Sequence, residues 1–396
     1  MNGDEAILRV AAKGDGITAS GRHVALAAPG DVIRADGSIV PGPSHATPPC
    51  RYYGTCGGCE LQHLDEATLT QFVYDRVVNA ASGQGLVPEL VTPAYLSPPR
   101  TRRRATLHAE RGAIGFRARG SHKIVDMREC HVLHPDLFAL IAPLRALLAR
   151  WPGKRLAADI HLVLVDQGVA VDLKGLTLDG LAQTEGLLDF ARDHGLARLT
   201  LDQGYGPEAM WEPEPVTVTL TNVAVALPPG GFLQATADGE AALVGAVREW
   251  LGGSVTVADL YAGLGTFAFA LAGPGKVLAV EAAQDAHFAC KAAAGRSGKP
   301  VHALHRDLYR NPLRTEELDR FAAVVLDPPR AGARDQVEQI AASAVARVAY
   351  VSCNPSSWAR DAATLVAGGY RLAELRPVGQ FRWSTHVELA SLFIRQ

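Results

Sequence analysis

Short aliphatic and β-branched runs alternate with longer amphipathic stretches through the second half of this 396-residue chain. From about Val255 the runs read VTVADLY, KVLAVE, VHALHRD, AAVVLD and VAYVS. This alternation predicts an open, parallel β-sheet wrapped by helices. Ligands of such sheets bind beyond the carboxyl ends of the strands, so the residues that end each run are the first candidates for function.

The first half shows a different alternation, of basic with apolar residues. Between Arg100 and Lys123 there are seven arginines and one lysine against a single acid, Glu110. Apolar residues such as Leu107 and Ile114 recur between them, which predicts a β-hairpin with one wet, basic face. Arginine forks match phosphate oxygens, and neutralising phosphates releases counterions, so we favour nucleic acid over a plain solvated surface.

Composition narrows the class of protein. The length predicts two or three domains, and the 48% hydrophobic and 20% charged residues are typical of a globular protein. The chain has 39 basic and 41 acidic residues, and this near balance does not indicate a particular binding partner. The opening MNGDEAILRV lacks the regions of a signal peptide, and no run of about 18 apolar residues predicts a membrane span. We therefore expect a cytoplasmic protein without a membrane partner.

The first strand ends favour an adenosine-containing cofactor. DLYAGLGTF, residues 259–267, is a glycine turn between a strand and a helix, where backbone amides can approach a ligand. Glu281 ends the next strand and is placed to accept ribose hydroxyls. Asp307 follows the third strand, where it is placed to accept an adenine amino group. Either acid alone could be an ordinary helix N-cap, and the set suits S-adenosylmethionine or a nicotinamide dinucleotide.

The later strand ends carry candidate chemistry. LDPPR places Asp327 before two prolines, which make a stiff turn and fix the direction of its carboxyl. VSCNP puts Cys353 in a polar turn at the rim of the sheet, where a thiolate can attack a substrate. Cys290, in contrast, reads as a small buried hydrophobic residue. Glu388, in THVELASLFI, begins a strong strand and is a candidate general base.

Four of the six cysteines form a further group. Cys50, Cys56 and Cys59 have the spacing C-x5-C-x2-C, and Cys130 lies at the end of the basic segment. In a reducing compartment, clustered cysteines bind metal more often than they form disulfides. Four thiolates suit either zinc or a [4Fe-4S] cluster, and spacing alone leaves both open.

DLYAGLGTF, LDPPR, VSCNP and THVE, in this order and spacing, resemble the S-adenosylmethionine-dependent RNA 5-methyluridine methyltransferases. GGFLQATADG also looks like the family's phenylalanine-any-glutamine segment, which would make Gln234 a cofactor contact. The resemblance extends over essentially the whole chain. It implies an α/β fold, with a Rossmann-like class I methyltransferase domain over residues 226–396.

The same resemblance implies two further domains. Residues 1–42 would form a small TRAM-like, OB-type RNA-binding β-barrel. Residues 43–225 would form a central, β-rich RNA-binding domain that carries the cysteine site. Its helical part, residues 60–92, is a candidate to pack with the catalytic domain.

The resemblance also implies a mechanism. The Cys353 thiolate would add to the 6-carbon of uracil, and after methyl transfer Glu388 would remove the 5-proton so that the cysteine can leave. The target base would have to be flipped or presented in a loop. The residues implied to hold the cofactor or line the site between cofactor and base are Gln234, Tyr261, Thr266, Glu281, Asp307 and Asp327.

Two positions depart from the family pattern. Many members have asparagine where this chain has Thr236, two residues after the glutamine, and where it has Thr266, after the glycine turn. Both threonines keep a hydroxyl donor. We therefore expect these contacts to be altered but not lost.

For the four cysteines the resemblance favours a [4Fe-4S] cluster over zinc. Iron–sulfur members of the family show C-x5-C-G-G-C and a distant cysteine after a basic hairpin, as here. Such a cluster would join the two ends of the basic segment. The cysteines also favour 23S rRNA over the tRNA T-loop as the substrate, because the well-known bacterial tRNA enzymes of the family lack them.

We expect a monomer that binds RNA. Three other hypotheses remain to be separated from it: an RNA cytidine-5 methyltransferase, a nicotinamide-dependent oxidoreductase, and a non-catalytic RNA-binding module. The first shares the fold and the cofactor, the second shares the glycine turn, and the third needs no nucleophile at Cys353.

Overall fold

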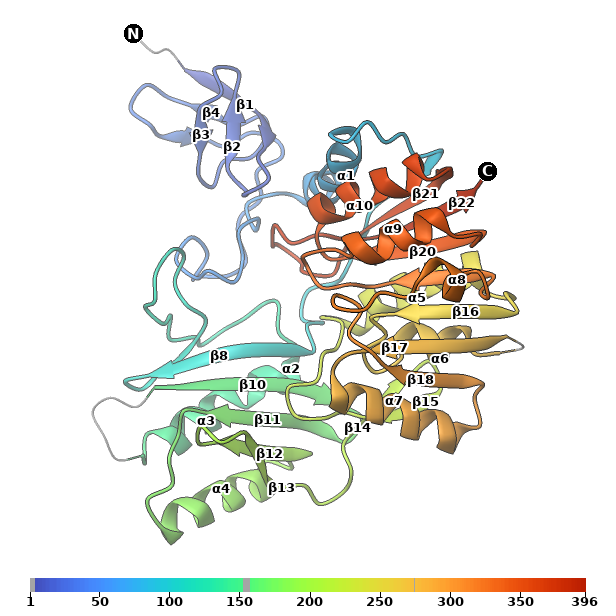
Figure 1. The fold of residues 1–396 in the computed structure, drawn as a ribbon. Coiled ribbons are helices and arrows are strands. Elements are labelled where there is room, and N and C mark those ends of the chain that lie inside the picture. The colour runs from blue at the N-terminus through green and yellow to red at the C-terminus, as the bar shows by residue number, and fades with distance from the viewer. Residues whose placement is uncertain (1–3, 152–156, 274) are drawn as a thin grey trace.

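The computed structural model describes residues 4–151, 157–273 and 275–396 and shows three β-sheet units along the chain (Figure 1). The first is a five-stranded sheet of order β3-β2-β1-β4-β5. Its small core contains Ile7, Ala27 and Ile33. This sheet spans the region expected to form a TRAM-like barrel, an assignment that stays a prediction. Its strands are β1 (Glu5–Val10), β2 (Gly16–Thr18), β3 (His23–Val24), β4 (Val32–Ile33) and β5 (Ile39–Val40).

The central unit is a six-stranded sheet of order β13-β12-β11-β10-β8-β9 with helices packed on its apolar face. The helices are α2 (Pro135–Ala139), α3 (Ile141–Leu148) and α4 (Leu181–Asp193). The strands are β8 (Arg104–Glu110), β9 (Ala113–Gly115), β10 (Ala157–Val165), β11 (Gly168–Lys174), β12 (Arg198–Asp202) and β13 (Pro207–Trp211). A hairpin of β14 (Thr217–Leu220) and β15 (Val223–Ala226) follows.

The hairpin predicted within the basic segment is present, but its wet face is not basic. Strands β8 and β9 pair antiparallel, and Ala105 and Leu107 are buried. The period of two then turns Arg104, Thr106, His108 and Glu110 away from that apolar face, so only one arginine of the segment lies on the wet face. The paired strands are short, so most of the arginines fall before the hairpin, in its turn or after it.

The C-terminal unit is a nine-stranded sheet of the described residues, with the main order β18-β17-β16-β19-β20-β22-β21-β6 and β7 also paired to β21. The predicted parallel runs are confirmed as β16–β20, and β22 runs antiparallel to both of its neighbours. The strands are β6 (Leu90–Val91), β7 (Tyr95–Leu96), β16 (Thr256–Leu260), β17 (Lys276–Glu281), β18 (Val301–His305), β19 (Ala323–Leu326), β20 (Arg347–Ser352), β21 (Tyr370–Gly379) and β22 (Glu388–Arg395).

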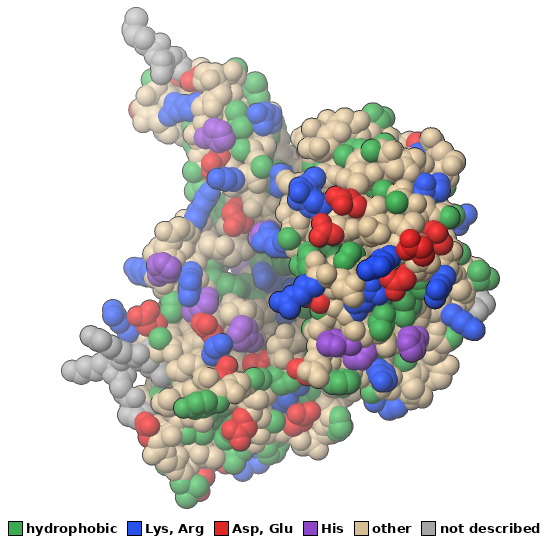
Figure 2. All heavy atoms as spheres, viewed as in Figure 1, with side chains coloured by type: hydrophobic (Ala, Val, Ile, Leu, Met, Phe, Trp, Pro, Cys, Tyr) green, Lys and Arg blue, Asp and Glu red, His purple; other side chains and the backbone are tan. Residues whose placement is uncertain are grey.

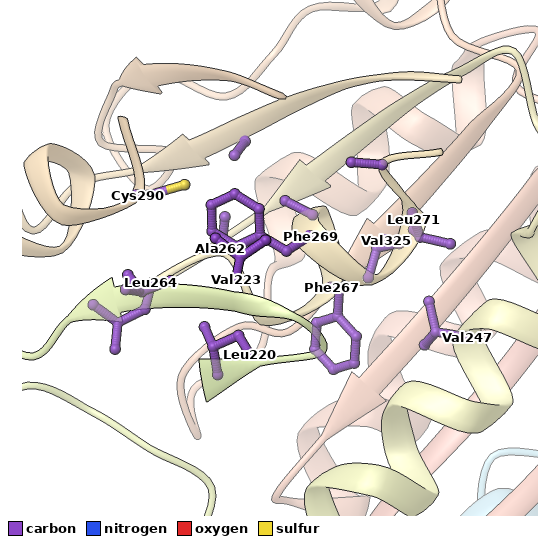
Figure 3. Close-up of a cluster of buried hydrophobic side chains, with 14 of the residues drawn as sticks. Leu220, Val223, Val247, Ala262, Leu264, Phe267, Phe269, Leu271, Cys290 and Val325 are labelled. Carbon is purple, nitrogen blue, oxygen red and sulfur yellow. The ribbon is translucent and has the colours of Figure 1, made fainter. Parts of the chain in front are cut away.

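Helices cover both faces of this sheet (Figure 1). The core on one face is formed by the β14–β15 hairpin with α5 (Ala237–Leu251), α6 (Thr266–Leu271) and α7 (Gln284–Ser297). Figure 3 shows this core, including Phe267, Val325 and the Cys290 thiol. Cys290 is 1% exposed, which confirms its interpretation as a core residue.

The other face carries α1 (Glu66–Ser82), α8 (Thr315–Leu318), α9 (Arg334–Ala342) and α10 (Pro355–Ala367). Helix α1 begins at the N-cap Asp65, whose side chain accepts from the Thr68 amide. It contacts α10 and β21, and β6 and β7 add to the edge of the sheet. The part of the chain from α1 to β7, before the basic hairpin, is thus built into the C-terminal unit. Among the described residues, no helix is long and apolar enough to span a membrane.

Candidate active site

A cavity of about 600 Å³ lies at the carboxyl ends of the parallel strands. This is the edge of the sheet at which the sequence predicted a ligand. The cavity is lined by residues from the segment before α5, the glycine turn, the ends of β17–β20 and the start of β22. The eight side chains predicted for cofactor binding or chemistry that it brings together are Gln234, Tyr261, Thr266, Glu281, Asp307, Asp327, Cys353 and Glu388.

The glycine turn is shaped by left-handed backbone conformations. Tyr261 has φ +63° and Gly265 has φ +94°. A Cβ on Gly265 would lie 2.9 Å from the Cys290 Sγ, so no larger residue fits there without movement. The Glu281 carboxylate accepts hydrogen bonds from the Gly263 amide at 2.8 Å and the Ala283 amide at 2.7 Å. Glu281 is thereby held rigidly at the cavity wall.

Asp307 lines the same cavity and also stabilises its own turn. Its Oδ1 accepts from the Tyr309 amide at 2.9 Å, and the carboxylate lies 3.4 Å from the Arg310 guanidinium. The Tyr309 ring lies 5.5 Å from the Tyr261 ring, measured between centroids. Two aromatic rings therefore stand beside Asp307, at a wall able to take a flat, apolar group.

Strand register brings Cys353 and Glu388 together. Strands β20 and β22 pair antiparallel with Ser352 opposite Leu389, so Cys353 and Glu388 are the next residues along that register. Opposite residues in an antiparallel pair have Cβ atoms about 5 Å apart. A candidate nucleophile and a candidate base, 35 residues apart in the sequence, thus line one corner of the cavity.

The two carboxyl groups in this corner resist ionisation. Burial raises the pKa of Asp327 to about 7. Burial, and then repulsion from Asp327, raise the pKa of Glu388 to about 8. Burial and repulsion from both carboxylates raise the pKa of the Cys353 thiol to about 11. The corner therefore holds protons near neutral pH, and a bound cation would lower all three pKa values.

Gln380 joins the site through side-chain amides, and sequence reasoning missed it. Its Nε2 donates to the Gln234 Oε1 at 2.7 Å, and the Gln234 Nε2 donates to the Asp327 Oδ2 at 3.4 Å. The Gln380 Oε1 accepts from the Thr236 amide at 3.3 Å, and the Gln380 side chain lowers the pKa of Glu388, against the larger effect of burial. The sequence offered one signal, a glutamine between the end of β21 and the HVE motif. The structure shows that this side chain is buried.

Thr236 has a different role from that implied by the resemblance. It is 1% exposed and forms the N-cap of α5, where its hydroxyl accepts from the Gly239 amide at 3.0 Å. It also hydrogen-bonds the Ser97 hydroxyl. Thr236 therefore supports the helix that follows Gln234, whereas Thr266 lines the cavity itself.

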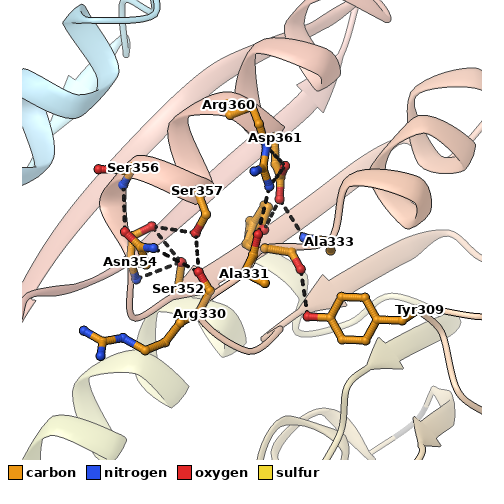
Figure 4. A network of polar contacts seen from close by, with 12 residues as sticks. Tyr309, Arg330, Ala331, Ala333, Ser352, Asn354, Ser356, Ser357, Arg360 and Asp361 are labelled. Atoms are coloured by element: carbon orange, nitrogen blue, oxygen red, sulfur yellow. Dashed lines mark hydrogen bonds and ion pairs between the residues drawn. The ribbon is translucent and has the colours of Figure 1, made fainter.

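A polar network fixes the loops that follow β19 and β20 to each other (Figure 4). The Arg330 carbonyl, in the loop after β19, accepts from the Asn354 side chain at 2.9 Å and the Ser357 hydroxyl at 3.0 Å. Asp361, which is 1% exposed, accepts from the Ala333 amide and the Tyr350 hydroxyl at 2.7 and 2.8 Å. The loops of Asp327 and Cys353 are thus locked in register.

The entrance of the cavity carries basic and aromatic groups. Arg330 donates to the His386 Nδ1 at 2.7 Å, and the Arg104 guanidinium lies 4.5 Å from the centre of the half-exposed Phe232 ring. Figure 2 shows lysine, arginine and histidine side chains around a hollow between the central and C-terminal units. Arginines and aromatic rings of this kind suit phosphates and unstacked bases.

The four cysteines predicted to bind metal line a second, smaller cavity, of about 30 Å³. No two of the chain's six cysteines form a disulfide. No three His, Cys, Asp or Glu side chains of the described residues are grouped as they would be around one metal ion. Burial raises the pKa of the Cys59 thiol to about 12. The four side chains are Cys50, Cys56, Cys59 and Cys130.

The two glycines of the cysteine motif pack against the basic segment. The Gly57 amide donates to the Arg117 carbonyl at 2.9 Å, and a Cβ on Gly57 would lie 2.9 Å from that oxygen. A Cβ on Gly58 would lie 3.3 Å from the Phe116 ring. Both glycines therefore allow close approach to the chain that leads to Cys130.

Known proteins are similar to this chain in sequence and in fold. A family profile described as tRNA (Uracil-5-)-methyltransferase matches residues 302–396. An uncharacterised RNA methyltransferase of Zymomonas mobilis is 45% identical over 393 residues, which cover 98% of this chain and 99% of that protein. The 23S rRNA (uracil(1939)-C(5))-methyltransferase RlmD of Chromohalobacter salexigens is 35% identical, over 89% of this chain and 77% of that protein.

A solved structure extends the likeness to the whole fold. The Pyrococcus abyssi tRNA (uracil-54, C5)-methyltransferase in complex with S-adenosyl-L-homocysteine matches with a TM-score of 0.79, over 99% of both chains and at 24% identity. The α/β architecture described above is therefore that of a known methyltransferase structure.

Proposed function

Because this chain belongs to the RNA uracil-5-methyltransferase family, we propose that it methylates the 5-carbon of a uridine in 23S rRNA, with Cys353 as nucleophile and Glu388 as general base. The observation that carries this assignment of residues is their placement side by side at the end of the cofactor cavity. S-adenosylmethionine supplies an electrophilic methyl group on a positively charged sulfur.

The cavity suits that cofactor. Its volume accommodates a nucleoside-sized ligand, and the rigid Glu281 carboxylate stands where ribose hydroxyls would bind. Asp307, with Tyr261 and Tyr309 beside it, forms a wall for the adenine. Gln234, Thr266 and Asp327 line the remaining wall. The roles of these seven residues are part of the proposal.

The proposed reaction begins with deprotonated Cys353. Its sulfur forms a bond to the 6-carbon of uracil, and the electrons of the 5,6 double bond move into an enolate. The 5-carbon would then be nucleophilic enough to take the methyl group, whose bond to the cofactor sulfur would break to leave a neutral thioether. Glu388 then takes the proton from the 5-carbon. The electrons of that C–H bond re-form the 5,6 double bond, and the bond from sulfur to the 6-carbon breaks. The cationic cofactor favours ionisation of Cys353 and Glu388 before the reaction.

Variants of Cys353 test the assignment of the nucleophile. With Cys353→Ala we expect loss of methyl transfer to RNA and of the covalent complex with 5-fluorouridine RNA. Tritium release from uracil labelled at the 5-position, compared with labelled cytosine, separates uridine from cytidine chemistry. A Cys353→Ala protein that still methylates RNA would exclude the proposed mechanism, and Cys290→Ala is the matched control because that thiol is in the core.

We propose 23S rRNA as the substrate because a relative that covers most of this chain is named for that activity. Mapping 5-methyluridine in rRNA and tRNA from a strain that lacks the gene tests this. We expect one or more 23S rRNA uridines to lose the methyl group. Loss at the tRNA T-loop instead would assign the protein to tRNA.

We also propose that the four cysteines hold a [4Fe-4S] cluster. Four thiols around one cavity are the donor set that such a cluster uses, and a cluster there would join residues 50–59 to Cys130. Cys56→Ser is expected to lower the iron content and remove the visible absorbance of the purified protein. A variant with unchanged iron and colour, or a native protein that contains zinc, would rule the cluster out.

A further inference from the structure

The segment that leads to Glu388 has no regular secondary structure of its own. Residues 380–387 connect β21 to β22 and end directly at the Glu388 carboxyl. Helix and strand hydrogen bonds therefore do not fix this segment, although the proposed base must be held to within a fraction of an ångström. Its position depends on contacts with other parts of the chain.

The first of these contacts comes from the cysteine motif. The amides of Glu60 and Leu61, the two residues after Cys59, both donate to the Trp383 carbonyl, at 2.8 and 2.9 Å. The Trp383 side chain is 8% exposed and shares a hydrophobic core with Leu61 and Val387. The peptide next to a predicted cluster ligand is thus bonded to the middle of the segment.

The conformation of Trp383 shows that this contact holds the chain under constraint. Its φ is +61°, in the left-handed region that bulky residues avoid. Such a conformation costs on the order of 1–3 kcal/mol and persists only where the surroundings enforce it. The two amides and the core around the indole are the surroundings that do so.

Arg102 provides the second contact. Its side chain lines the four-cysteine cavity, and its guanidinium lies 5.5 Å from the centre of the Phe381 ring. Phe381 in turn packs against His386, with 5.8 Å between ring centres. The Arg102 amide donates to the carbonyl of Val132, two residues after Cys130. Arg102 therefore connects both the cavity and the chain near Cys130 to the segment.

The opposite end of the segment is held by the methyltransfer site. Gln380 is bonded to Gln234 and to the Thr236 amide. The segment is therefore attached to both the cofactor cavity and the cysteine cavity, and also through Arg382 to Glu66 and the Ser97 carbonyl and through His386 to Arg330. Of these attachments, the one to the cysteine cavity is the one next to the four cysteines.

We propose that Arg102 and Trp383 are positioning residues that tie residues 380–387 to the four-cysteine site, so that the state of this site controls removal of the 5-proton by Glu388. The inference rests on the proposed function, because it assigns a regulator to the same base. It leaves cofactor binding and the attack of Cys353 to other parts of the cavity.

The order of bond changes makes the inference specific. Once the 5-carbon carries the methyl group, the 6-carbon is still bonded to the Cys353 sulfur, and only loss of the 5-proton expels that sulfur. A displaced Glu388 would therefore leave methylated RNA attached to the protein. A defect in cofactor binding or in Cys353 would instead prevent methylation.

Single-turnover assays on a 23S rRNA transcript with methyl-labelled cofactor test this. We expect Arg102→Met to slow release of methylated RNA from the covalent complex roughly tenfold to a hundredfold, as a misplaced catalytic group does. Methyl transfer and cofactor affinity should stay within about twofold of wild type, and Arg102→Lys should recover part of the release rate. Arg320→Met, at an exposed position outside the basic segment and both cavities, is the control, and Glu388→Gln marks complete loss of the base.

The inference would be overturned if Arg102→Met released RNA at the wild-type rate, or if it slowed methyl transfer and release equally. Trp383→Phe and Trp383→Ala add a second pair, in which the smaller side chain should slow release more than the aromatic one. If the rate of RNA release falls further as the side chain at position 383 becomes smaller, while cofactor affinity stays the same, Trp383 has a positioning role.

Hydrogen exchange tests the connection without RNA. In full-length Cys56→Ser we expect faster exchange of amides in residues 380–388 than in the loaded protein, with residues 259–267 unchanged. Equal exchange in residues 380–388 would refute the connection. If wild-type protein methylates no RNA, the proposed function fails, and exchange still decides whether the two sites are connected.

Discussion

At the scale of a single residue, the burial of Glu388 affects both the stability of the protein and the proposed reactivity of this carboxyl. Its carboxyl is 4% exposed and lies near Asp327, so the protonated form is favoured in the folded protein. A base must be ionised to accept a proton. The burial that raises the pKa of Glu388, and so would make it a stronger base in the proposed reaction, also makes its carboxyl costly to ionise.

One consequence is a pH dependence of product release. Below a pKa of about 8 the free protein holds Glu388 protonated, so release should increase as the pH rises through this range. Asp327→Asn removes the repulsion that contributes to the raised pKa, so the midpoint should move to lower pH. Single-turnover release between pH 6 and 9, at saturating cofactor, measures this, and an unchanged midpoint would contradict it.

A second consequence concerns stability. Between the ordinary carboxyl pKa and about 8, folded Glu388 binds more protons than unfolded Glu388, so its contribution to stability falls as the pH rises. Glu388→Gln removes this penalty. We expect the variant to gain on the order of 1 kcal/mol in the free energy of unfolding at pH 8 and less at pH 5. Urea denaturation at the two pH values is the measurement, and equal gains would argue against it.

At the scale of elements, α10 and the ends of β19 and β20 act as one unit. Asp361 on α10 reaches both the loop after Pro329 and the Tyr350 hydroxyl (Figure 4). The Asn354 and Ser357 side chains bind the Arg330 carbonyl from the same helix start. The loops of the nucleophile and of Asp327 are therefore positioned by one helix.

Breaking this unit should lower stability and slow the chemistry together. Asp361→Ala leaves the Tyr350 hydroxyl, the Ala333 amide and Arg360 without their partner, so we expect a loss of about 3–5 kcal/mol. Tyr350→Phe removes a single hydrogen bond and should cost about 1 kcal/mol. Chemical denaturation of both variants checks the order, and equal losses would show that Asp361 does not join the loops.

At the scale of the whole molecule, the last part of the basic segment, from Arg117 to Lys123, lies against the cysteine motif. Exposed Arg117 and Lys123 follow the hairpin, where Gly57 contacts the Arg117 backbone. Exposed basic side chains beside a rigid motif suit a phosphate backbone. We therefore assign them to RNA affinity and not to catalysis.

Substitution of both exposed residues tests that assignment. Arg117→Gln with Lys123→Gln should weaken RNA binding and reduce the slope of log K against log salt by about 1 to 2, because up to two phosphate contacts are lost. Cofactor affinity should not change. Titrations with a 23S rRNA transcript at several salt concentrations measure the slope, and an unaltered slope would place the RNA elsewhere.

The strands and strand ends were readable from the sequence because hydrophobic runs and turn residues are local signals. VTVADLY, AAVVLD and VAYVS became buried strands, and the predicted acids and Cys353 appear at their ends in one cavity. The prediction of a basic face on the hairpin was wrong, because most arginines of the segment lie outside the paired strands.

Other features depended on contacts between distant segments. Pairing of β22 with β20 places Glu388 beside Cys353, and no local pattern encodes that register. Gln380 joins the site, and Trp383 is bonded to the chain after Cys59, only because the fold brings residues 146 and more than 300 positions apart into contact. The sequence by itself determined the chemical groups and the rhythm of the sheet. Tertiary structure decided which groups meet, because pairing and burial are properties of the folded chain.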